Sequence, residues 1–172
     1  MGIIKSHFVG DYPAIQDCYR KQFLFHQTPV LFDWRDMCGG RSDYNAWLLQ
    51  APVDVVVATF SVVDRESFEN VKSNWLLTCK EKVPDVPIVI LGTKFDLRDE
   101  GKYKNNDPNN LVSFSEAEEF SKSLGCEYVE ISTKQMEGLN DLVAAVVRTH
   151  CKNVLDENSS SQQSNSDSLF FF

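Results

Sequence analysis

Three polar motifs in this sequence follow apolar runs directly, and their residue types could bind a ligand. They are Thr93-Lys94-Phe95-Asp96, Ser132-Thr133-Lys134 and Asp36-Met37-Cys38-Gly39. A carboxylate can accept hydrogen bonds, and ammonium and hydroxyl groups can donate them. In an open parallel sheet, ligands bind at the carboxyl ends of the strands. If the apolar runs form parallel strands, the three motifs lie at one edge of the sheet and predict a binding site there.

Five segments of the sequence predict strands. Most of the apolar runs contain few polar residues, as expected of strands that are buried on both faces. The predicted strands are Tyr19–His26, Pro29–Trp34, Val53–Ser61, Pro87–Gly92 and Glu127–Ile131. The first two are close enough in the sequence to be joined by a turn at Gln27-Thr28.

Four segments predict helices. Arg41–Gln50 is amphipathic, and Arg65–Lys82 carries apolar residues at helical spacing with Asp64 near its cap. A third helix begins at the capping box Ser115-Glu116-Ala117-Glu118 and ends at Gly125. One face of the last helix consists of Leu139, Leu142, Val143, Val146, Val147 and Cys151. Because strands and helices alternate, the sequence predicts an α/β domain with a mainly parallel sheet and flanking helices.

The sequence predicts one domain and a tail. The domain covers residues 1–155 and includes a polar, Asn-rich surface insertion at about 99–112. Residues 156–172 are rich in Ser, Gln and Asn and end in Leu169-Phe170-Phe171-Phe172. Such a segment cannot bury enough apolar surface to fold alone, so we expect a disordered tail.

Composition argues against several classes of function. The chain has 17 Lys and Arg residues against 25 Asp and Glu, for a formal net charge of -8. We therefore expect no nucleic-acid binding, which needs clustered positive charge. The five cysteines include no pair at metal-ligand spacing, so they predict no metal site and are best explained as reduced thiols of a cytosolic protein. No apolar run has the length of a membrane span.

The motifs resemble those of the Ras superfamily of small GTPases, and the resemblance covers about residues 6–154. It implies a P-loop NTPase fold that binds GTP and GDP. Thr93, Lys94 and Asp96 match the [NT]KxD motif, in which the aspartate accepts hydrogen bonds from guanine and the lysine packs along the base. The segment Ser132-Thr133-Lys134 is similar to the SAK motif, whose backbone N–H meets the guanine oxygen, although Thr133 replaces the alanine.

The resemblance extends to the phosphate side and to the effector surface. Asp36 and Gly39 match the DxxG motif, whose aspartate holds Mg²⁺ through water and whose glycine contacts the γ-phosphate. Residues 13–22 look like the switch I segment of Ras and Rap proteins, which implies effectors or regulators of small GTPases as partners. The matching effector positions are Pro13, Ile15, Asp17 and Tyr19. By contrast, Gly92–Asp99 and the insertion look like those of Rho and Rac proteins.

Several functional groups of the family have no match in this chain. No GxxxxGK[ST] phosphate-binding loop occurs in the sequence. If residues 7–9 are aligned with the start of the family's switch I segment, residues 1–6 match the end of its first helix, and the first strand has no match in this sequence. Ala14 stands where the family has a Mg²⁺-binding threonine, and Gly40 stands where it has the glutamine that orients water. We therefore predict no catalytic residue, doubtful Mg²⁺ binding and little hydrolysis, because phosphoryl transfer depends on these groups.

These departures leave three hypotheses. The chain could be a degenerate G domain that acts through its switch surface, with weak or no GTP binding. It could be the N-terminally incomplete sequence of a GTP-hydrolysing Rho or Ras-type switch, or a non-functional remnant. A simple truncation would leave the family's threonine and glutamine in place at positions 14 and 40. This sequence has Ala14 and Gly40 there instead, so it favours the first hypothesis.

The termini bear on membrane attachment. No cysteine follows Cys151, so the sequence has no C-a-a-X prenylation motif. Residues 1–6 fit M-G-x-x-x-[ST], which would allow N-myristoylation of Gly2, although a coincidental glycine is the simpler explanation. A single acyl chain gives only marginal membrane binding. We expect a cytoplasmic protein that associates with membranes weakly at most.

The missing strand has a structural consequence. In the family fold, it lies between the strands that correspond to Pro29–Trp34 and Val53–Ser61. Removing about five buried apolar side chains would cost on the order of 10 kcal/mol, which is comparable to the stability of a whole domain. Either the two neighbouring strands pair directly in parallel, or another chain supplies a strand, or the protein is marginally stable and aggregates through its open edges. We expect direct pairing, with poor stability in solution.

Overall fold

A computed structural model describes the backbone of residues 18–35 and 53–166, and the side chains of residues 20–35 and 53–152. The chain divides into two units, Met1–Gln50 and Ala51–Phe172. The first unit contains a hairpin and the second contains a parallel sheet with helices. Each unit is described by itself.

The hairpin consists of β1 (Cys18–Phe25) and β2 (Thr28–Arg35), which pair antiparallel. The prediction of two strands is therefore confirmed. The turn lies at His26 and Gln27, one residue earlier than predicted, and both adopt positive φ angles of 45° and 66°. Two consecutive left-handed residues suit the twist of a two-residue hairpin turn, and the β-branched Thr28 instead pairs with Phe25 in the ladder.

Aromatic side chains line one face of the hairpin. The rings of Phe23 and Phe32 meet edge to face at 5.3 Å, and those of Phe32 and Trp34 stack at 5.3 Å. Leu24 and Leu31 lie at alternate positions on the other face and are 74% and 62% exposed. Cross-strand aromatic pairs of this kind stabilise two-stranded pairing.

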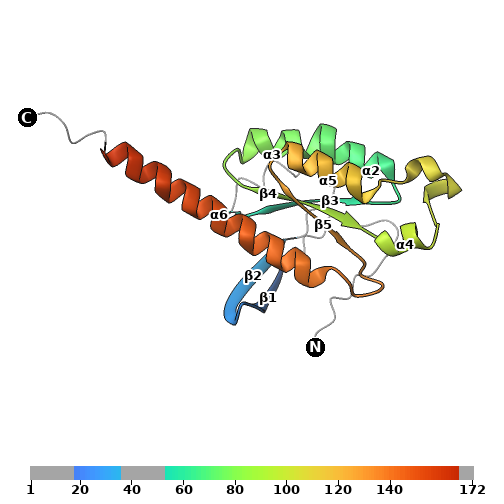
Figure 1. Ribbon diagram of the computed structural model, residues 1–172, viewed down its shortest axis with the longest axis horizontal. Helices are drawn as coiled ribbons and strands as arrows, with labels where there is room; N and C mark the ends of the chain where they lie inside the picture. The colour runs from blue at the N-terminus through green and yellow to red at the C-terminus, as the bar shows by residue number, and fades with distance from the viewer. Residues whose placement is uncertain (1–17, 36–52, 167–172) are drawn as a thin grey trace, which may run out of the picture. The chain divides into compact units, whose positions relative to one another are not determined.

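The second unit contains three parallel strands in the order β3-β4-β5 (Figure 1). They are β3 (Val56–Ser61), β4 (Ile88–Thr93) and β5 (Glu127–Ile131). The prediction of an α/β fold with a parallel sheet and flanking helices is confirmed. The middle strand β4 is buried at four consecutive positions from Val89 to Gly92, as a strand covered on both faces should be.

The expected direct pairing of Pro29–Trp34 with Val53–Ser61 would join the two units, and it stays a prediction. Among the described residues of each unit, β2 pairs only with β1, and β3 pairs only with β4. The expectation assumed that strands on either side of a missing neighbour would close the gap. Within its unit, β2 pairs with β1 along the whole length of one of its two edges.

The predicted helix Arg65–Lys82 is present as three continuous pieces. They are α2 (Arg65–Asn70), a π-helical turn at Val71–Trp75, and α3 (Leu76–Lys82). Asp64 precedes α2 as expected, but its side chain makes no capping hydrogen bond. Its carboxylate instead accepts a hydrogen bond from Lys104 in the insertion at 2.9 Å.

The next helix, α5 (Phe114–Ser123), begins earlier than predicted. Its N-cap is Ser113, whose hydroxyl accepts a hydrogen bond from the backbone N–H of Glu116 at 3.2 Å. The prediction of a capping box at Ser115 was therefore wrong, because the sequence offers two overlapping Ser-x-x-Glu patterns and the first caps the helix. Gly125, with φ of +70°, follows the helix as predicted.

The last helix is α6 (Leu139–Ser166). Leu142, Val143, Val146 and Val147 are buried as predicted, whereas Cys151 is exposed. The helix continues past the predicted domain end at residue 155 and into the segment that we expected to be disordered. No glycine or proline lies within it to end the helical backbone. Among the described helices, none has both the length and the apolar character needed to span a bilayer.

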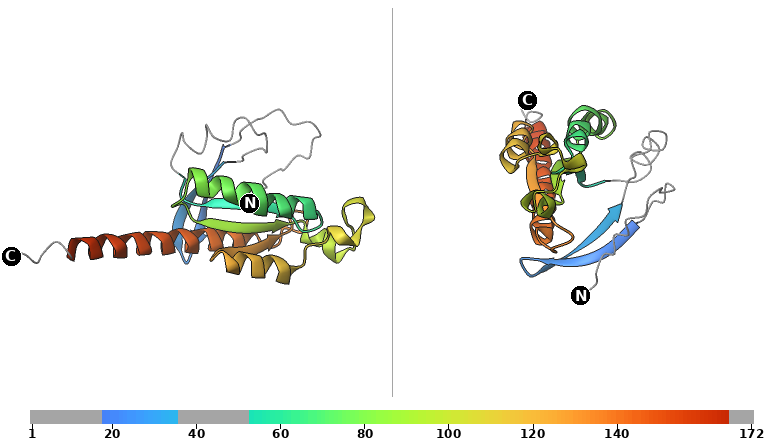
Figure 2. Two further views of the ribbon diagram at one scale, coloured as in Figure 1. Left: turned by 90° about the horizontal axis from the view of Figure 1, so that it is seen from above. Right: turned by 90° about the vertical axis from the view of Figure 1, so that its right-hand side faces the viewer.

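Helices cover both faces of the parallel sheet. Figures 1 and 2 show α2, α3 and α5 on one face and α6 on the other. On the first face, Phe60 packs against Phe68 with ring centroids 4.7 Å apart, in a core that includes Val71 and Ile90. On the second face, α6 contacts β4 and β5. The strand edge that carries the predicted motifs is therefore supported from both sides.

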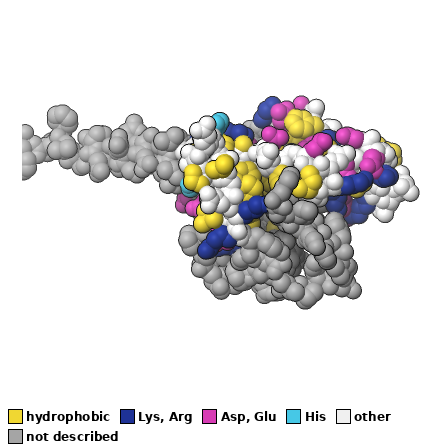
Figure 3. Space-filling view, turned by 90° about the horizontal axis from the view of Figure 1, so that it is seen from below, with side chains coloured by type: hydrophobic (Ala, Val, Ile, Leu, Met, Phe, Trp, Pro, Cys, Tyr) yellow, Lys and Arg dark blue, Asp and Glu magenta, His cyan; other side chains and the backbone are white. Residues whose placement is uncertain are grey.

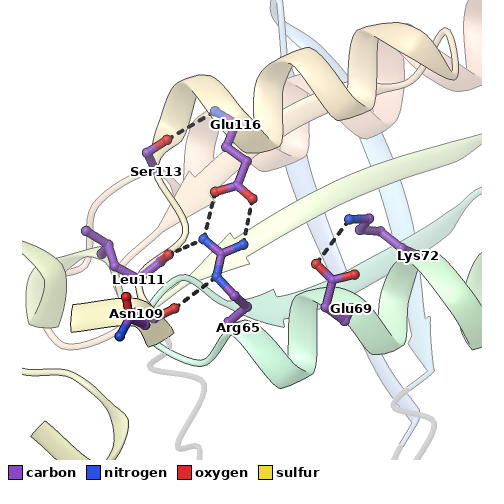
Figure 4. Close-up of polar contacts among 7 residues, drawn as sticks. All are labelled: Arg65, Glu69, Lys72, Asn109, Leu111, Ser113 and Glu116. Atoms are coloured by element: carbon purple, nitrogen blue, oxygen red, sulfur yellow. Dashed lines mark hydrogen bonds and ion pairs between the residues drawn. The ribbon is translucent and has the colours of Figure 1, made fainter. Parts of the chain in front are cut away.

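The predicted insertion is bound to the rest of this unit through Arg65 (Figure 4). The guanidinium donates hydrogen bonds to the backbone carbonyls of Asn109 and Leu111. It also donates to both carboxylate oxygens of Glu116 on α5, at 2.6 and 2.9 Å. One side chain at the start of α2 thus fixes the end of the insertion and the first turn of α5.

Candidate functional site

Two of the three predicted motifs lie side by side at the carboxyl ends of adjacent strands. The first follows β4 and leads into the short helix α4 (Phe95–Asp99), and the second follows β5. The backbone N–H of Lys94 donates to the carbonyl of Ile131 at 3.0 Å, which continues the pairing of the strands beyond β4. Parallel pairing of β4 with β5 is thus what brings the two motifs together.

Lys94 occupies a sparsely populated backbone conformation. Its φ and ψ angles are 65° and 34°, in the left-handed region that non-glycine residues seldom adopt. The residue lies between the end of β4 and the first residue of α4, where the chain must turn sharply. Strained residues of this kind cluster at binding sites, where the surrounding structure holds them in place.

Asp96 is the central group of the site. The residue is only 3% exposed, and its Oδ1 accepts a hydrogen bond from the Ser132 hydroxyl at 2.7 Å. Ser132 is itself 1% exposed and accepts a hydrogen bond from the backbone N–H of Gln135. A hydroxyl can donate once and accept twice, so Ser132 links the carboxylate to the turn that follows β5.

Lys134 supplies positive charge beside this carboxylate. Its ammonium lies 3.9 Å from Asp96 Oδ2 and donates a hydrogen bond to Glu100 at 2.7 Å. The hydrogen bond from Lys102 and, to a smaller extent, the one from Lys134 lower the pKa of Glu100 to about 2. The hydrogen bond to Glu100 also raises the pKa of Lys134. Lys134 is 61% exposed, so it can move aside for a ligand at little cost.

The two threonines of these motifs make no hydrogen bond to the Asp96 carboxylate in the described part of the chain. Thr93 directs its hydroxyl back to the sheet, where it donates to the carbonyl of Phe60 at 2.9 Å. Thr133 is exposed at the turn after β5. Thr93 therefore supports the strand edge, and the groups that could face a ligand come from Asp96 and the segment Ser132–Lys134.

The third predicted motif and several other predicted positions lie outside the described residues. They are Gly2, Pro13, Ala14, Ile15, Asp17, Asp36, Gly39 and Gly40, and the predicted helix Arg41–Gln50 is also among them. The backbone of Tyr19 belongs to β1, but its side chain is not described. Within residues 20–35 and 53–152, no group of three His, Cys, Asp or Glu side chains could hold a metal ion.

Sequence reasoning missed a half-buried charged cluster that joins the same elements, α4 and β5. Arg98 of α4 donates two hydrogen bonds to the carboxylate of Glu130, at 2.8 and 2.5 Å. The Tyr128 hydroxyl donates to the same carboxylate at 2.6 Å. A signal was present, because Tyr128 and Glu130 alternate along a buried strand, and a carboxylate in such a position needs a partner.

Charges of both signs are mixed on the described surface. On the face shown in Figure 3, Lys and Arg side chains are interspersed with Asp and Glu. A protein that binds nucleic acid instead presents a stripe or patch of positive charge. This face offers no such continuous patch among the described side chains.

Comparisons with known proteins identify the family of this chain. The model of the Ras family matches residues 2–152. The Rho-related protein racM of Dictyostelium discoideum is 33% identical over 102 residues, which are 59% of this chain and 53% of that protein. The chain thus spans about half the length of this curated relative. Because the family match covers most of the chain, the protein belongs to the Ras family of small GTPases.

Proposed function

We propose that this protein is a signalling G domain of degenerate type, which recognises guanine, binds GTP and GDP weakly, and acts through its switch surface. The observation that carries the proposal is the buried carboxylate of Asp96 beside the segment Ser132–Lys134. This arrangement at one sheet edge supports the proposal that the chain keeps the guanine-reading half of a small GTPase.

The carboxylate of Asp96 fits a guanine base. Guanine presents two adjacent donors, its ring N–H and its amino group, and a carboxylate can accept both. The protein uses Oδ1 for Ser132, and Oδ2 receives no hydrogen bond from the described part of the chain. Each carboxylate oxygen has about two acceptor positions, so capacity for two more hydrogen bonds is present.

Weak affinity for the phosphates follows from the residues on their side of the site. The 172-residue sequence contains no GxxxxGK[ST] motif, whose backbone N–H groups would surround the β-phosphate. Ala14 has no oxygen to offer Mg²⁺, and Gly40 has no side chain to orient water. Gly40 and Ala14 would limit hydrolysis even in a chain that carried such a loop.

The proposed partners are effectors or regulators of small GTPases, which would contact Pro13, Ile15, Asp17 and Tyr19. This part of the proposal depends on the resemblance of residues 13–22 to switch I. We propose a cytoplasmic location, with at most weak membrane association through Gly2.

Titration with fluorescent GDP tests the proposal. Base contacts without a phosphate cradle should give a Kd in roughly the millimolar range, about −4 kcal/mol. Excess GDP should compete for the site and ADP should not, because adenine lacks the two adjacent donors. Single-turnover hydrolysis of GTP should equal that of a buffer blank.

Two variants make the titration specific. Asp96→Ala should abolish the residual binding, and Asp85→Ala, which removes an exposed aspartate between α3 and β4, should not change it. Nanomolar, Mg²⁺-dependent binding would contradict the proposal and support an active switch. Binding that survives Asp96→Ala would show that guanine is not read at this site.

A further inference from the structure

Three side-chain pairs connect α4 to the segment that runs from β5 into the following turn. Asp96 accepts a hydrogen bond from Ser132, Arg98 donates to Glu130, and Glu100 accepts from Lys134. The members on α4 and its C-cap lie at alternate positions, 96, 98 and 100. The site residue Asp96 is thus the first of a row of connections rather than an isolated carboxylate.

The pair of Arg98 and Glu130 is the most buried ion pair of this row. The Glu130 side chain is 8% exposed and the Arg98 side chain is 20% exposed, whereas Lys134 is 61% exposed. Arg98 binds both carboxylate oxygens, and this bidentate hydrogen bonding raises its pKa. A bidentate guanidinium fixes direction as well as distance, so this pair can set the orientation of α4.

Two neighbours hold Glu130 in position from the sheet side. The Tyr128 hydroxyl donates a hydrogen bond to Glu130. Burial raises the pKa of this phenol most, and the hydrogen bond raises it further, so the phenol keeps its proton and remains a donor. Gly92 on β4 lies opposite Glu130 in the ladder. A Cβ at Gly92 would lie 2.5 Å from the Tyr128 hydroxyl oxygen and 3.1 Å from Glu130 Cγ. The space above Gly92 is therefore needed for this cluster.

The helix α4 cannot fix the direction of Asp96 by itself. It has five residues, and an isolated helix of that length is not stable in water. Side chains two residues apart project about 200° from each other around a helix. Asp96 and Arg98 therefore leave α4 in different directions, yet both bind the β5 segment, and together they restrain the rotation of α4 about its own axis.

We propose that Arg98, held by Glu130 and Tyr128, is a positioning residue for guanine recognition, which directs the Asp96 carboxylate so that it can accept two hydrogen bonds from the base at once. The proposal rests on the proposed reading of guanine by Asp96. Ser132 restrains one carboxylate oxygen, and Arg98 determines the plane in which the other oxygen lies. A rotated carboxylate would still reach one donor of the base, but not both.

Comparison of GMP with IMP isolates this role. Hypoxanthine, the base of IMP, keeps the ring N–H of guanine and lacks the amino group. A correctly directed carboxylate should therefore favour GMP by about tenfold, the effect of one hydrogen bond to a charged group. Loss of direction lowers this ratio, whereas a loss of folded protein lowers the apparent binding of both nucleotides equally.

The experiment titrates the full chain with GMP and IMP and follows backbone amide shifts by NMR. The variants are Arg98→Ala, Arg98→Lys and, as control, Arg148→Ala, which removes a second arginine that binds both oxygens of a glutamate on β5, Glu127. We expect the ratio of the Kd for IMP to the Kd for GMP to fall to about threefold or less in Arg98→Ala. It should be intermediate in Arg98→Lys and unchanged in the control.

The outcomes separate this proposal from the proposed function. If the unaltered chain binds GMP and IMP equally or not at all, guanine reading by Asp96 is wrong, and this proposal is wrong with it. If the unaltered chain prefers GMP and folded Arg98→Ala keeps the full ratio, Arg98 is not a positioning residue, although the proposed function stands. If Arg98→Ala does not fold, Arg98→Lys decides, and a full ratio there overturns the proposal.

Discussion

Asp96 is a buried carboxylate whose acceptor capacity the described protein groups use only in part. One oxygen accepts from Ser132, and the ammonium of Lys134 lies 3.9 Å from the other. A buried charge with an open acceptor position is costly unless a ligand or water completes it. This unused acceptor capacity supports the proposal that the Asp96 carboxylate binds a ligand.

The choice of base should change when this carboxylate becomes an amide. Asp96→Asn replaces one acceptor oxygen with a donor N–H, and xanthine carries a carbonyl oxygen where guanine carries its amino group. We expect the preference to shift from GMP to XMP, by about tenfold or more in the ratio of the two Kd values. NMR titration of both proteins measures the ratio, and an unchanged preference would show that Asp96 does not contact this side of the base.

The exposed carboxylate Glu100 should titrate far below its ordinary pKa. Lys102 and Lys134 lower its pKa from 4.5 to about 2. Because the folded-state pKa is depressed, its stabilising effect is complete above about pH 4.5 and is lost as the pH falls towards 2. NMR titration of the Glu100 carboxyl carbon measures this shift.

Matched lysine variants separate the two causes. Lys102→Ala should raise the pKa of Glu100 more than Lys134→Ala does, because the hydrogen bond from Lys102 has the larger effect. Both lysines are largely exposed, so high salt should also raise this pKa. A pKa that neither variant moves would mean that these contacts do not persist in solution.

The residues of the site were predictable to the extent that short motifs carried them. Asp96 and Ser132 were identified because each follows a buried strand, and the structure brings both side chains into contact. Arg98 and Glu130 were not identified, because their pairing depends on how α4 lies over β5. Sequence spacing shows that Glu130 needs a partner, but it does not show which of 17 basic residues provides it.

At the scale of elements, Arg65 is the connection whose loss should have the clearest effect. Its bonds reach Asn109, Leu111 and Glu116, and thus join α2, the insertion and α5 (Figure 4). Arg65 and Glu116 are 36% and 38% exposed, so solvent screens their ion pair. The two backbone carbonyls depend on the same guanidinium and would have to find water instead.

We expect Arg65→Ala to lower the free energy of unfolding by about 1–2 kcal/mol after allowance for screening. Arg65→Lys should recover only part of this, since an ammonium lacks the planar fork of donors. Arg148→Ala removes a similar but more exposed pair, at 54% and 38%, and should cost about 1 kcal/mol or less. Urea unfolding measures all three, and equal effects of Arg65→Ala and Arg148→Ala would contradict the role given to the backbone carbonyls.

Elements with a strong local pattern were predicted correctly, and β5 and the helix from Arg65 to Lys82 also have the predicted ends, whereas some other ends were missed. The strands β4 and β5 and the helix from Arg65 to Lys82 follow from apolar runs and helical spacing. The start of α5 at Ser113 was missed because two overlapping capping patterns compete, and only the surrounding contacts decide between them. The turn of the hairpin was displaced by one residue for a similar reason, since register depends on both strands at once.

At the scale of the whole molecule, the order β3-β4-β5 leaves one edge of β3 without a strand partner among the described residues of its unit. Val56 and Val62 donate their N–H groups to carbonyls at the two ends of β4, Pro87 and Thr93. In a parallel ladder, the backbone N–H and C=O groups of every second residue point to the same neighbouring strand. The backbone groups of Ala58 therefore point to β4, and those of Thr59 point to the other edge. An open edge of this kind is a template for pairing with another chain.

Proline substitution tests whether this edge is open in solution. At Thr59, proline removes an N–H that faces away from β4, so we expect a loss of stability of about 1 kcal/mol or less and weaker self-association. At Ala58, proline removes an N–H that faces β4 and clashes within the sheet, so we expect a loss of at least about 2 kcal/mol. Urea unfolding and light scattering over a range of protein concentrations measure the two effects. Equal destabilisation by the two prolines would show that a further strand pairs with β3. The expected poor stability of the chain depends on the same open edge, so that result would also contradict this expectation.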